Sequence, residues 1–353
     1  MKKTFLILAI SGLFGLFALS LPAFSEQIPG KQPAIQSAQE AEYPPNKWGF
    51  IDEQGNFTIE PQYDFIWQSF FKGLAGVYSN KTYKMIDRNN NIISEFEAVS
   101  VDKFSEGLAR AKSGNKYGFI NFKGEFVIPP QYVDAGHFQN GLASVYVDGK
   151  WGYINMKNEM VIEPTFNTVR PFNSGIAAVA VDNKFGYIGK NGRFVINPQF
   201  NYAGDFIQGL AVASLSGLYG YINTDGKFVI NPKFEHAQPF NNGLAIVKQN
   251  GLYGYINKRG IMLIDPQYKQ AFNFEGNLAA VKIDGKFGYI NKKGILQIDT
   301  SFDEAYNFEN KRAKVRIEDK WGFIDMNGNL IVDPKYAAAY NYAENVAAVK
   351  TQK

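Results

Sequence analysis

A six-residue phrase decides the fold of this chain: Lys150-Trp151-Gly152-Tyr153-Ile154-Asn155. Equivalent phrases occur nine times, and their leading aromatic residues are Trp48, Tyr83, Tyr117, Trp151, Phe185, Tyr219, Tyr253, Phe287 and Trp321. The first spacing is 35 residues and every later spacing is 34. Such a regular period indicates a repeat array rather than one ordinary globular core.

The phrase itself predicts a strand that runs into a tight turn. Ile stands three positions after the leading aromatic residue in all nine copies, and the residue before it is usually Phe or Tyr. Aromatic and β-branched residues favour strands. Asn or Asp usually follows, and three positions later comes Gly, or Asn90 and Asn158 in two copies. This pattern fits a type I turn closed by a left-handed residue, which Asn tolerates after Gly.

Two further runs complete the unit. The first, Phe126-Val127-Ile128 in one copy, is followed by Pro130, which cannot continue a paired ladder. The second reads Gly141-Leu142-Ala143-Ser144-Val145 and leads through Asp148-Gly149, a strong hairpin signal, back to the phrase. The unit is therefore predicted to be a three-stranded antiparallel meander.

Both faces of the middle strand are apolar, since Trp151 and Tyr153 point one way and Gly152 and Ile154 the other. Each sheet should therefore be covered on both sides by neighbouring units. We expect Gly152 to leave room for a neighbour's ring. The Ala of the third run, present in every copy from Ala75 to Ala347, suggests close approach of a neighbouring copy.

The ends of the array predict how it is arranged. It opens within a unit, at Lys47-Trp48-Gly49, and finishes with the strand that the first unit lacks, Val346-Ala347-Ala348-Val349. The last strand could complete the first unit and remove exposed sheet edges. The fold class is therefore all-β: nine meander repeats in a closed, β-propeller-like ring. An open superhelical β-repeat array is the alternative.

The N-terminal residues predict export. Residues 1–25 combine Lys2 and Lys3, an apolar run and Ala23-Phe24-Ser25 at the cleavage position, which is typical of a signal peptide. A membrane anchor is the alternative, and no Cys follows the run to carry a lipid. Residues 26–46 are predicted to be a flexible linker, and residues 47–353 the repeat domain. We expect a periplasmic or extracellular bacterial protein that is not integral to the membrane.

Composition narrows the possible functions. The chain has no Cys, so an exported form would have no disulfide framework. Its formal charge is +4, and loss of Lys2 and Lys3 would leave about +2. Charge so close to balance argues against a nucleic-acid partner.

The signature pairs Trp48 and Gly49, Trp151 and Gly152, and Trp321 and Gly322 each follow a Lys. Together with the Gly-closed turn, the Pro-x-aromatic slot and the Gly-Leu-Ala-x-Val run, they resemble the WG (KWG) repeat family of bacterial proteins. The resemblance covers residues 47–350. It implies interaction modules with no catalytic residues attached to the repeat.

Few residues stand out as candidate sites. His137 and His236 fall in different slots and need not meet, so a metal site or a His-dependent nucleophile has little support. Asp87 begins a stretch like a calcium loop, but Ile92 and Ala98 replace its Gly and Glu. We interpret that stretch as the usual turn.

Charged and divergent residues supply weaker candidates. Arg170 and Asp205 occupy slots that are uncharged in most copies and lie near the predicted unit edge. The Lys before the aromatic residue recurs in six copies, but nearby Asp residues favour a self-neutralised rim. The second unit has Lys84 in place of Gly and lacks the Pro-x-aromatic slot. Sequence drift explains this divergence, or the unit forms a local binding surface.

Three function hypotheses follow. The first is an exported, non-enzymatic β-repeat scaffold that binds a protein or a cell-envelope component, with no catalytic, cofactor or metal site. The second is glycan or peptidoglycan binding through some of the 30 Phe, 20 Tyr and 4 Trp residues, although their fixed slots favour core packing for most of them. The third is a propeller-type hydrolase, which would need an acidic cluster that the sequence does not display.

Overall fold

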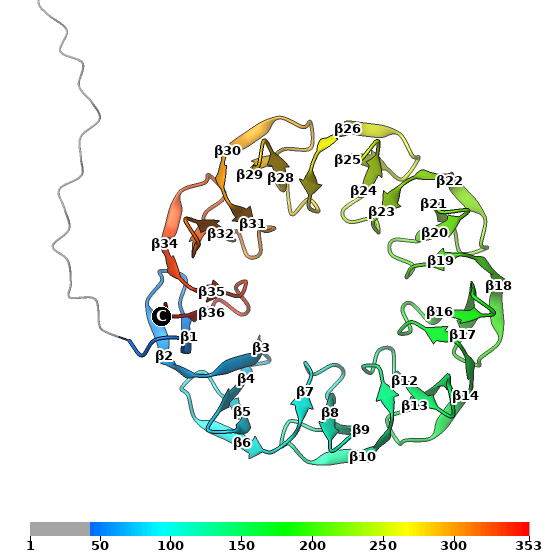
Figure 1. Cartoon of the computed structure of the whole chain (residues 1–353), viewed down its shortest axis with the longest axis horizontal. Helices are drawn as coiled ribbons and strands as arrows, with labels where there is room; N and C mark the ends of the chain where they lie inside the picture. The colour runs from blue at the N-terminus through cyan, green and yellow to red at the C-terminus, as the bar shows by residue number, and fades with distance from the viewer. Residues whose placement is uncertain (1–42, 353) are drawn as a thin grey trace, which may run out of the picture. The chain divides into compact units, whose positions relative to one another are not determined.

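The computed structural model describes residues 43–352, which form 36 β-strands arranged as nine four-stranded antiparallel sheets. The sheets stand like blades around a ring, and eight of the nine blades run from a short strand near the centre to a long strand at the rim (Figure 1). The predicted closed ring of nine units is therefore confirmed, and the open array is not formed.

The strands fall into four classes by their place in a blade. The innermost strands are β3 (Phe65–Phe71), β7 (Ser100–Val101), β11 (Asp134–Ala135), β15 (Thr168–Val169), β19 (Tyr202–Ala203), β23 (His236–Ala237), β27 (Gln270–Ala271), β31 (Glu304–Ala305) and β35 (Ala338–Ala339). The second strands are β4 (Leu74–Ser79), β8 (Ala109–Ser113), β12 (Leu142–Val147), β16 (Ile176–Val181), β20 (Ala211–Leu215), β24 (Leu244–Gln249), β28 (Ala279–Ile283), β32 (Ala313–Ile317) and β36 (Ala347–Lys350).

The signature phrase forms the third strands: β1 (Trp48–Ile51), β5 (Thr82–Ile86), β9 (Lys116–Ile120), β13 (Lys150–Asn155), β17 (Lys184–Gly189), β21 (Leu218–Ile222), β25 (Leu252–Asn257), β29 (Lys286–Ile290) and β33 (Lys320–Ile324). The outer strands are β2 (Phe57–Tyr63), β6 (Ile92–Phe96), β10 (Phe126–Tyr132), β14 (Met160–Phe166), β18 (Phe194–Phe200), β22 (Phe228–Phe234), β26 (Met262–Tyr268), β30 (Leu296–Phe302) and β34 (Leu330–Tyr336).

We number the blades from 1 (β3 to β6) to 8 (β31 to β34) in chain order. Blade 9 combines both ends of the described chain, in the order β2-β1-β36-β35. Its β1 and β36 pair over four residues each, from Trp48 opposite Lys350 to Ile51 opposite Ala347. This junction is the closure that the ends of the array predicted.

Each blade has one strand more than the three expected. The extra, innermost strand is only two residues long in eight blades, for example Asp134 and Ala135 opposite Tyr146 and Val145. Its second residue is Ala or Val in all eight, and pairing with the second strand holds it in place. A closed ring needs this strand because it covers the inner edge of the second strand.

The predicted turns are present. Gly55 donates its N–H to the Asp52 carbonyl at 3.2 Å, and Asn90 and Asn158 take the left-handed conformation, each with a φ of 66°. Asp148 and Gly149 both have positive φ, as a two-residue hairpin requires. We call the side of the ring with these hairpins the hairpin face, and the side with the Asx turns, such as residues 155–158, the turn face.

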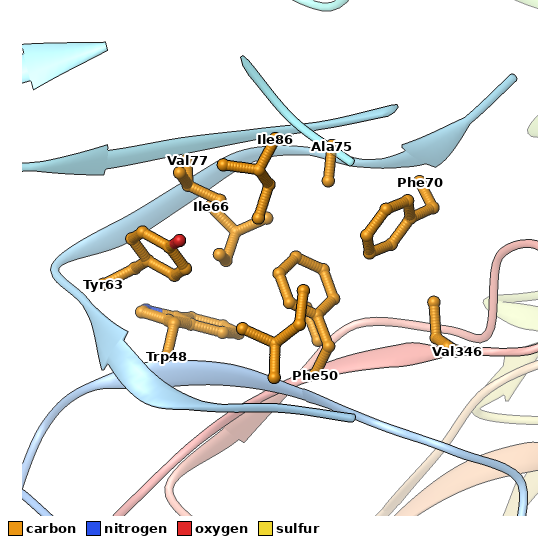
Figure 2. Close-up of a cluster of buried hydrophobic side chains, with 11 residues drawn as sticks. Trp48, Phe50, Tyr63, Ile66, Phe70, Ala75, Val77, Ile86 and Val346 are labelled. Carbon is orange, nitrogen blue, oxygen red and sulfur yellow. The ribbon is translucent and has the colours of Figure 1, made fainter. Parts of the chain in front are cut away.

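The core lies between the blades, in nine separate clusters. Figure 2 shows the cluster at the junction of blades 9 and 1, where Trp48, Phe50 and Val346 meet Ile66 and Phe70. Elsewhere Tyr153 packs towards blade 4 and Ile154 towards blade 2, so the predicted two-sided cover is confirmed. The recurring Ala is buried in these interfaces, as Ala143 is against residues of blade 2.

The signature Gly has another role than the one we expected. A Cβ at Gly152 would lie 2.5 Å from the carbonyl oxygen of Ile162 and 2.8 Å from the nitrogen of Pro164, both in the outer strand of the same blade. That strand bulges towards the Gly, since Trp151 pairs with Phe166 but Tyr153 pairs with Ile162. The Gly therefore accommodates a backbone bulge, not a neighbour's ring.

The divergent second unit supports this explanation. Lys84 replaces Gly there, and β5 and β6 pair residue by residue from Tyr83 opposite Phe96 to Met85 opposite Ser94, with no bulge at that point. Lys84 is buried and its ammonium lies 3.4 Å from the Glu95 carboxylate. The Gly and the Pro-containing bulge are thus lost together in blade 1.

A buried tyrosine joins neighbouring blades in five places. Tyr221 donates its hydroxyl hydrogen to the carbonyl of Gln238 in blade 6 at 2.8 Å. The same bond, between residues 17 apart, is made by Tyr153, Tyr187, Tyr255 and Tyr289. Each bond fixes the innermost part of one blade to the third strand of the blade before it.

We expect Tyr221→Phe to lower the free energy of unfolding by about 1 kcal/mol, because the buried hydrogen bond is lost without a change in packing. Urea denaturation followed by circular dichroism measures this. Tyr219→Phe is the matched control, since that half-buried ring has no hydrogen bond recorded within residues 43–352. Equal effects of the two substitutions would contradict the assignment.

Residues 43–46, assigned above to the linker, contact the ring: Tyr43 packs edge-on against Phe57, and Pro44 accepts a hydrogen bond from Thr351 at 2.7 Å. The predicted signal peptide and the rest of the predicted linker lie outside the described residues. Within residues 43–352, no helix has the length and apolarity needed to span a membrane.

Candidate functional site

Polar and aromatic side chains gather where the inner parts of the blades meet the hairpin face. In blades 4 to 6 five rings follow one another across the interfaces, with centroids 5.7 to 6.4 Å apart: Phe185, Tyr202, Tyr219, His236 and Tyr253. A second run in blades 7 and 8 comprises Phe287, Phe272, Tyr306 and Trp321. Most of these rings are only partly buried, so their edges are accessible at the surface.

Cations from the second strands lie over several of these rings. The Lys248 ammonium is 5.5 Å from the centroid of Tyr253, and the Lys282 ammonium is 5.2 Å from that of Phe287. Lys314 lies closer still, 4.2 Å from the centroid of Tyr306. Cation–π contacts of this kind stabilise the charged form and keep the long side chains against the rings.

Arg170 and Asp205, singled out from the sequence, come together at the interface of blades 4 and 5. Arg170 donates a hydrogen bond to the Tyr202 hydroxyl at 3.0 Å and lies 5.1 Å from its ring centroid. Burial raises the pKa of the Asp205 carboxyl, and the charge of Arg170 offsets this only in part. The pair is therefore a local polar feature of the inner wall, made from two blades.

The described chain also holds a cleft between blades 7 and 8, with a volume of about 260 Å³. Its lining residues are Gln270, Phe272, Lys282, Phe287, Asp303, Glu304, Ala305, Tyr306 and Arg316. We call it the 7/8 cleft. It lies within the second run of rings and therefore combines aromatic surface with both signs of charge.

Three of the four charges at the 7/8 cleft are already paired. Arg316 donates to Glu304, with its Nη2 2.6 Å from the carboxylate. Asp303 pairs with Lys286 and accepts the Glu318 N–H at 2.9 Å, and these contacts, that of Lys286 first, lower its pKa. The ammonium of Lys282, in contrast, has no ion pair among residues 43–352.

Burial shifts the pKa of one residue that lines the cleft and of one residue beside it. The pKa of the Tyr306 hydroxyl is raised, first by burial and then by the charge of Glu304. The pKa of Lys314 is lowered by burial, although Glu304 and Glu309 counteract the effect. Lys314 donates to the Ala339 carbonyl at 3.1 Å and so supports Tyr306 from behind.

The other sequence candidates are placed apart or used structurally. His137 lies in blade 3 and His236 in blade 6, with two blades between them along the chain. Asp87 accepts hydrogen bonds from the N–H groups of Asn89 and Asn91, so the predicted turn is confirmed. Within residues 43–352 no group of three or more His, Asp or Glu side chains is placed to hold a metal ion.

The signature residues define the blade interfaces. Trp48 is buried and stacks on Tyr340 with a centroid distance of 4.9 Å, and Trp321 lies beneath Lys314 and Arg316. Trp151 packs at the interface of blades 3 and 4. Gly49, Gly152 and Gly322 all face the bulge of their own outer strand.

The sequence did not single out the residues of the 7/8 cleft. Lys282 occupies a slot that is also basic in four other copies, so it looked like a surface lysine. One sequence feature could have indicated the cleft. In blade 8 the Gly-Leu-Ala-x-Val run reads Lys311-Arg312-Ala313-Lys314-Val315 and continues into Arg316. This concentration of cations in an otherwise apolar strand marks the interface with the cleft.

Solved structures similar to this chain are propellers with low sequence identity. A eukaryotic initiation factor superposes with a TM-score of 0.58 at 8% identity, over 88% of this chain and 99% of the other. The dihydro-heme d1 dehydrogenase NirN, in complex with DHE, gives 0.45 at 10% identity, over 90% and 76%. Hsv2p of Kluyveromyces lactis gives 0.36 at 14% identity, over 60% and 76%.

Identities this low concern the fold alone, and among curated proteins none matches the sequence. Comparison with protein families is decisive. The WG containing repeat matches nine times, over residues 48–83, 85–117, 117–151, 151–185, 185–219, 219–253, 253–287, 287–321 and 321–352. The matches follow the repeat period and leave one residue uncovered between them, so the chain belongs to the WG-containing repeat family and forms its units into a nine-bladed β-propeller.

Proposed function

We propose that this protein is an exported, non-enzymatic scaffold that binds a protein or a component of the cell envelope through the hairpin face of its ring. The observation that carries the proposal is the concentration of partly exposed rings and overlying cations on that face. Such surfaces offer large contact area at low entropic cost, and aromatic residues and Arg are enriched among the residues that carry the binding energy of interfaces.

Export is supported by the N-terminal sequence. Residues 1–25 have the charged start, apolar run and small residues of a signal peptide. The lack of Cys is compatible with export because nine clusters of buried side chains stabilise the ring by packing.

Affinity capture tests the scaffold. The full chain, tagged at its C-terminus, is expressed in the producing cell, its exported form is purified, and it is then exposed to the envelope fraction. We expect a mature protein that begins near Glu26 and one reproducible partner. A variant with Lys248→Glu and Lys282→Glu on the hairpin face should lose that partner.

The matched control carries the same charge change on the turn face, as Lys123→Glu and Lys157→Glu. It should retain the partner. If both variants capture the partner as well as the original chain does, the hairpin face is not the binding surface. If the chain stays in the cytoplasm with residues 1–25 attached, the exported role is wrong.

Glycan or peptidoglycan binding is the second candidate, and the 7/8 cleft favours it. Rings that are partly exposed can stack on the C–H faces of sugars, while flanking carboxylates, amides and cations bind the hydroxyl groups. Sedimentation of the protein with purified cell-wall material tests this candidate, and retention in the supernatant would count against it.

A further inference from the structure

The walls of the 7/8 cleft come from two blades and meet at an angle. Phe272 of blade 7 lies 5.8 Å from Tyr306 of blade 8, with the rings inclined at 50°. Phe287 lies 6.1 Å from Phe272 at 53°. Phe287 is buried, whereas Phe272 and Tyr306 are partly exposed, so a ligand would rest on the exposed parts of these two rings. The floor of the cleft is therefore apolar.

The polar groups stand around this floor rather than beneath it. Gln270 is exposed at one side, and Lys282 lies on the same blade, over Phe287. Glu304 and Arg316 stand opposite, paired with each other from β31 and β32. The Arg316 Nε has no hydrogen-bond partner among residues 43–352. That nitrogen is buried, so the accessible cation of the cleft that has no ion pair within the described residues is Lys282.

The charges of the cleft favour an anionic ligand. Asp303 and Glu304 are satisfied by Lys286 and Arg316, whereas Lys282 has no carboxylate partner within the described part of the chain. An incoming carboxylate would complete an ion pair beside a ring, where the effective dielectric constant is lower than in water. A cationic ligand would instead have to displace an existing pair.

Size and shape restrict the class of anion further. The volume of about 260 Å³ is below the range of sites that enclose drug-sized ligands. An apolar floor of inclined rings with polar groups at its edges can hold a pyranose ring, which has C–H faces and an equator of hydroxyl groups. A sugar that carries a carboxylate satisfies both features.

We propose that the 7/8 cleft binds a carboxylated sugar residue, with the pyranose on Phe272 and Tyr306 and the carboxylate on Lys282. The proposal names the ligand class of the binding face and so rests on the proposed function. Its test uses soluble sugars and needs no envelope partner, so the two can fail separately.

The test is a titration of the full chain with D-glucuronate and with D-glucose. Binding is monitored by protein NMR or by calorimetry. The two sugars differ only in the carboxylate. We expect glucuronate to bind at least tenfold more tightly than glucose, since charged hydrogen bonds contribute more than neutral ones. Added salt should reduce this preference because the contact is partly exposed.

Two single variants localise the binding. Lys282→Gln should abolish the preference for glucuronate and leave the weak binding of glucose. Lys248→Gln is the matched control, because Lys248 holds the same slot over Tyr253 in blade 6. It should keep the full preference. Thermal melting confirms that both variants remain folded.

Three results would overturn the proposal. Equal affinity for the two sugars would show that Lys282 does not recognise a carboxylate. An equal loss in both variants would place the binding outside the 7/8 cleft. Lys282-dependent binding of an acidic peptide such as tetra-glutamate, with none of glucuronate, would assign the cleft to protein carboxylates instead.

Discussion

Truncation of the chain after Asn345 is expected to unfold the ring. The change removes β36, which pairs with β1 and with β35 and so holds the two ends of the described chain in one blade. Val346 and Val349 also leave the two clusters on either side of blade 9. Burial of two valines alone contributes about 4 kcal/mol, and β1, which still pairs with β2, gains an exposed edge.

Size-exclusion chromatography and thermal melting measure this effect. We expect aggregates or a broad transition in place of one cooperative unfolding step, since each blade is stabilised only by its neighbours. Truncation after Lys350 is the graded control. It keeps β36 and removes the hydrogen bonds between Thr351 and Lys47, so a loss of about 1 to 2 kcal/mol is expected. A chain ending at Asn345 that melts like the full chain would show that closure is dispensable.

Polar contacts also join blade 9 to blade 1, and the sequence alone could not reveal them. The Glu344 carboxylate accepts the N–H groups of Lys72 and Gly73, at 2.5 and 3.0 Å, and pairs with Arg88 at 2.9 Å. Burial opposes ionisation of Glu344, but these hydrogen bonds prevail and lower its pKa. The partners lie more than 250 residues apart in sequence, so only ring closure brings them together.

Local features of the fold were predictable because each depends on residues close in sequence. The Asx turns, the two-residue hairpins and the apolar faces of the third strands all followed from the repeat. The innermost strand did not. Its first position holds Asp134, Thr168, Tyr202 or His236 with no common chemistry, and the Ala or Val at its second position is too short a pattern to predict a strand. Its conformation is set by pairing with the second strand, which is a tertiary contact.

The candidate site was predictable only where a residue broke the repeat. Arg170 and Asp205 carry charges in slots that are uncharged in most copies, and the structure places them at one interface. Lys282 sits in an often basic slot, so its significance depends on which carboxylates are already paired around it. That information lies in distances between blades, which the period does not encode.

Substitution of the Gly in the signature phrase is the second change for which we expect a large loss of stability. Gly152→Ala should lower the free energy of unfolding by about 3 kcal/mol, at the upper end of what overpacking costs. The added Cβ would lie 2.5 Å from the Ile162 oxygen, and both atoms belong to backbone that pairs on either side of the bulge. No side-chain rotation can relieve such a contact, so β13 and β14 would have to separate.

Gly204→Ala is the matched control for this prediction. A Cβ at Gly204 would meet its nearest atom, the Val212 carbonyl oxygen, at 3.5 Å, an ordinary contact. Urea denaturation should therefore find this variant close to the original chain in stability. Similar losses at both positions would mean that Gly152 is needed for backbone flexibility rather than for space. Blade 1 already supports the explanation that the Gly makes space for the bulge, since Lys84 occupies the Gly slot where the bulge is absent.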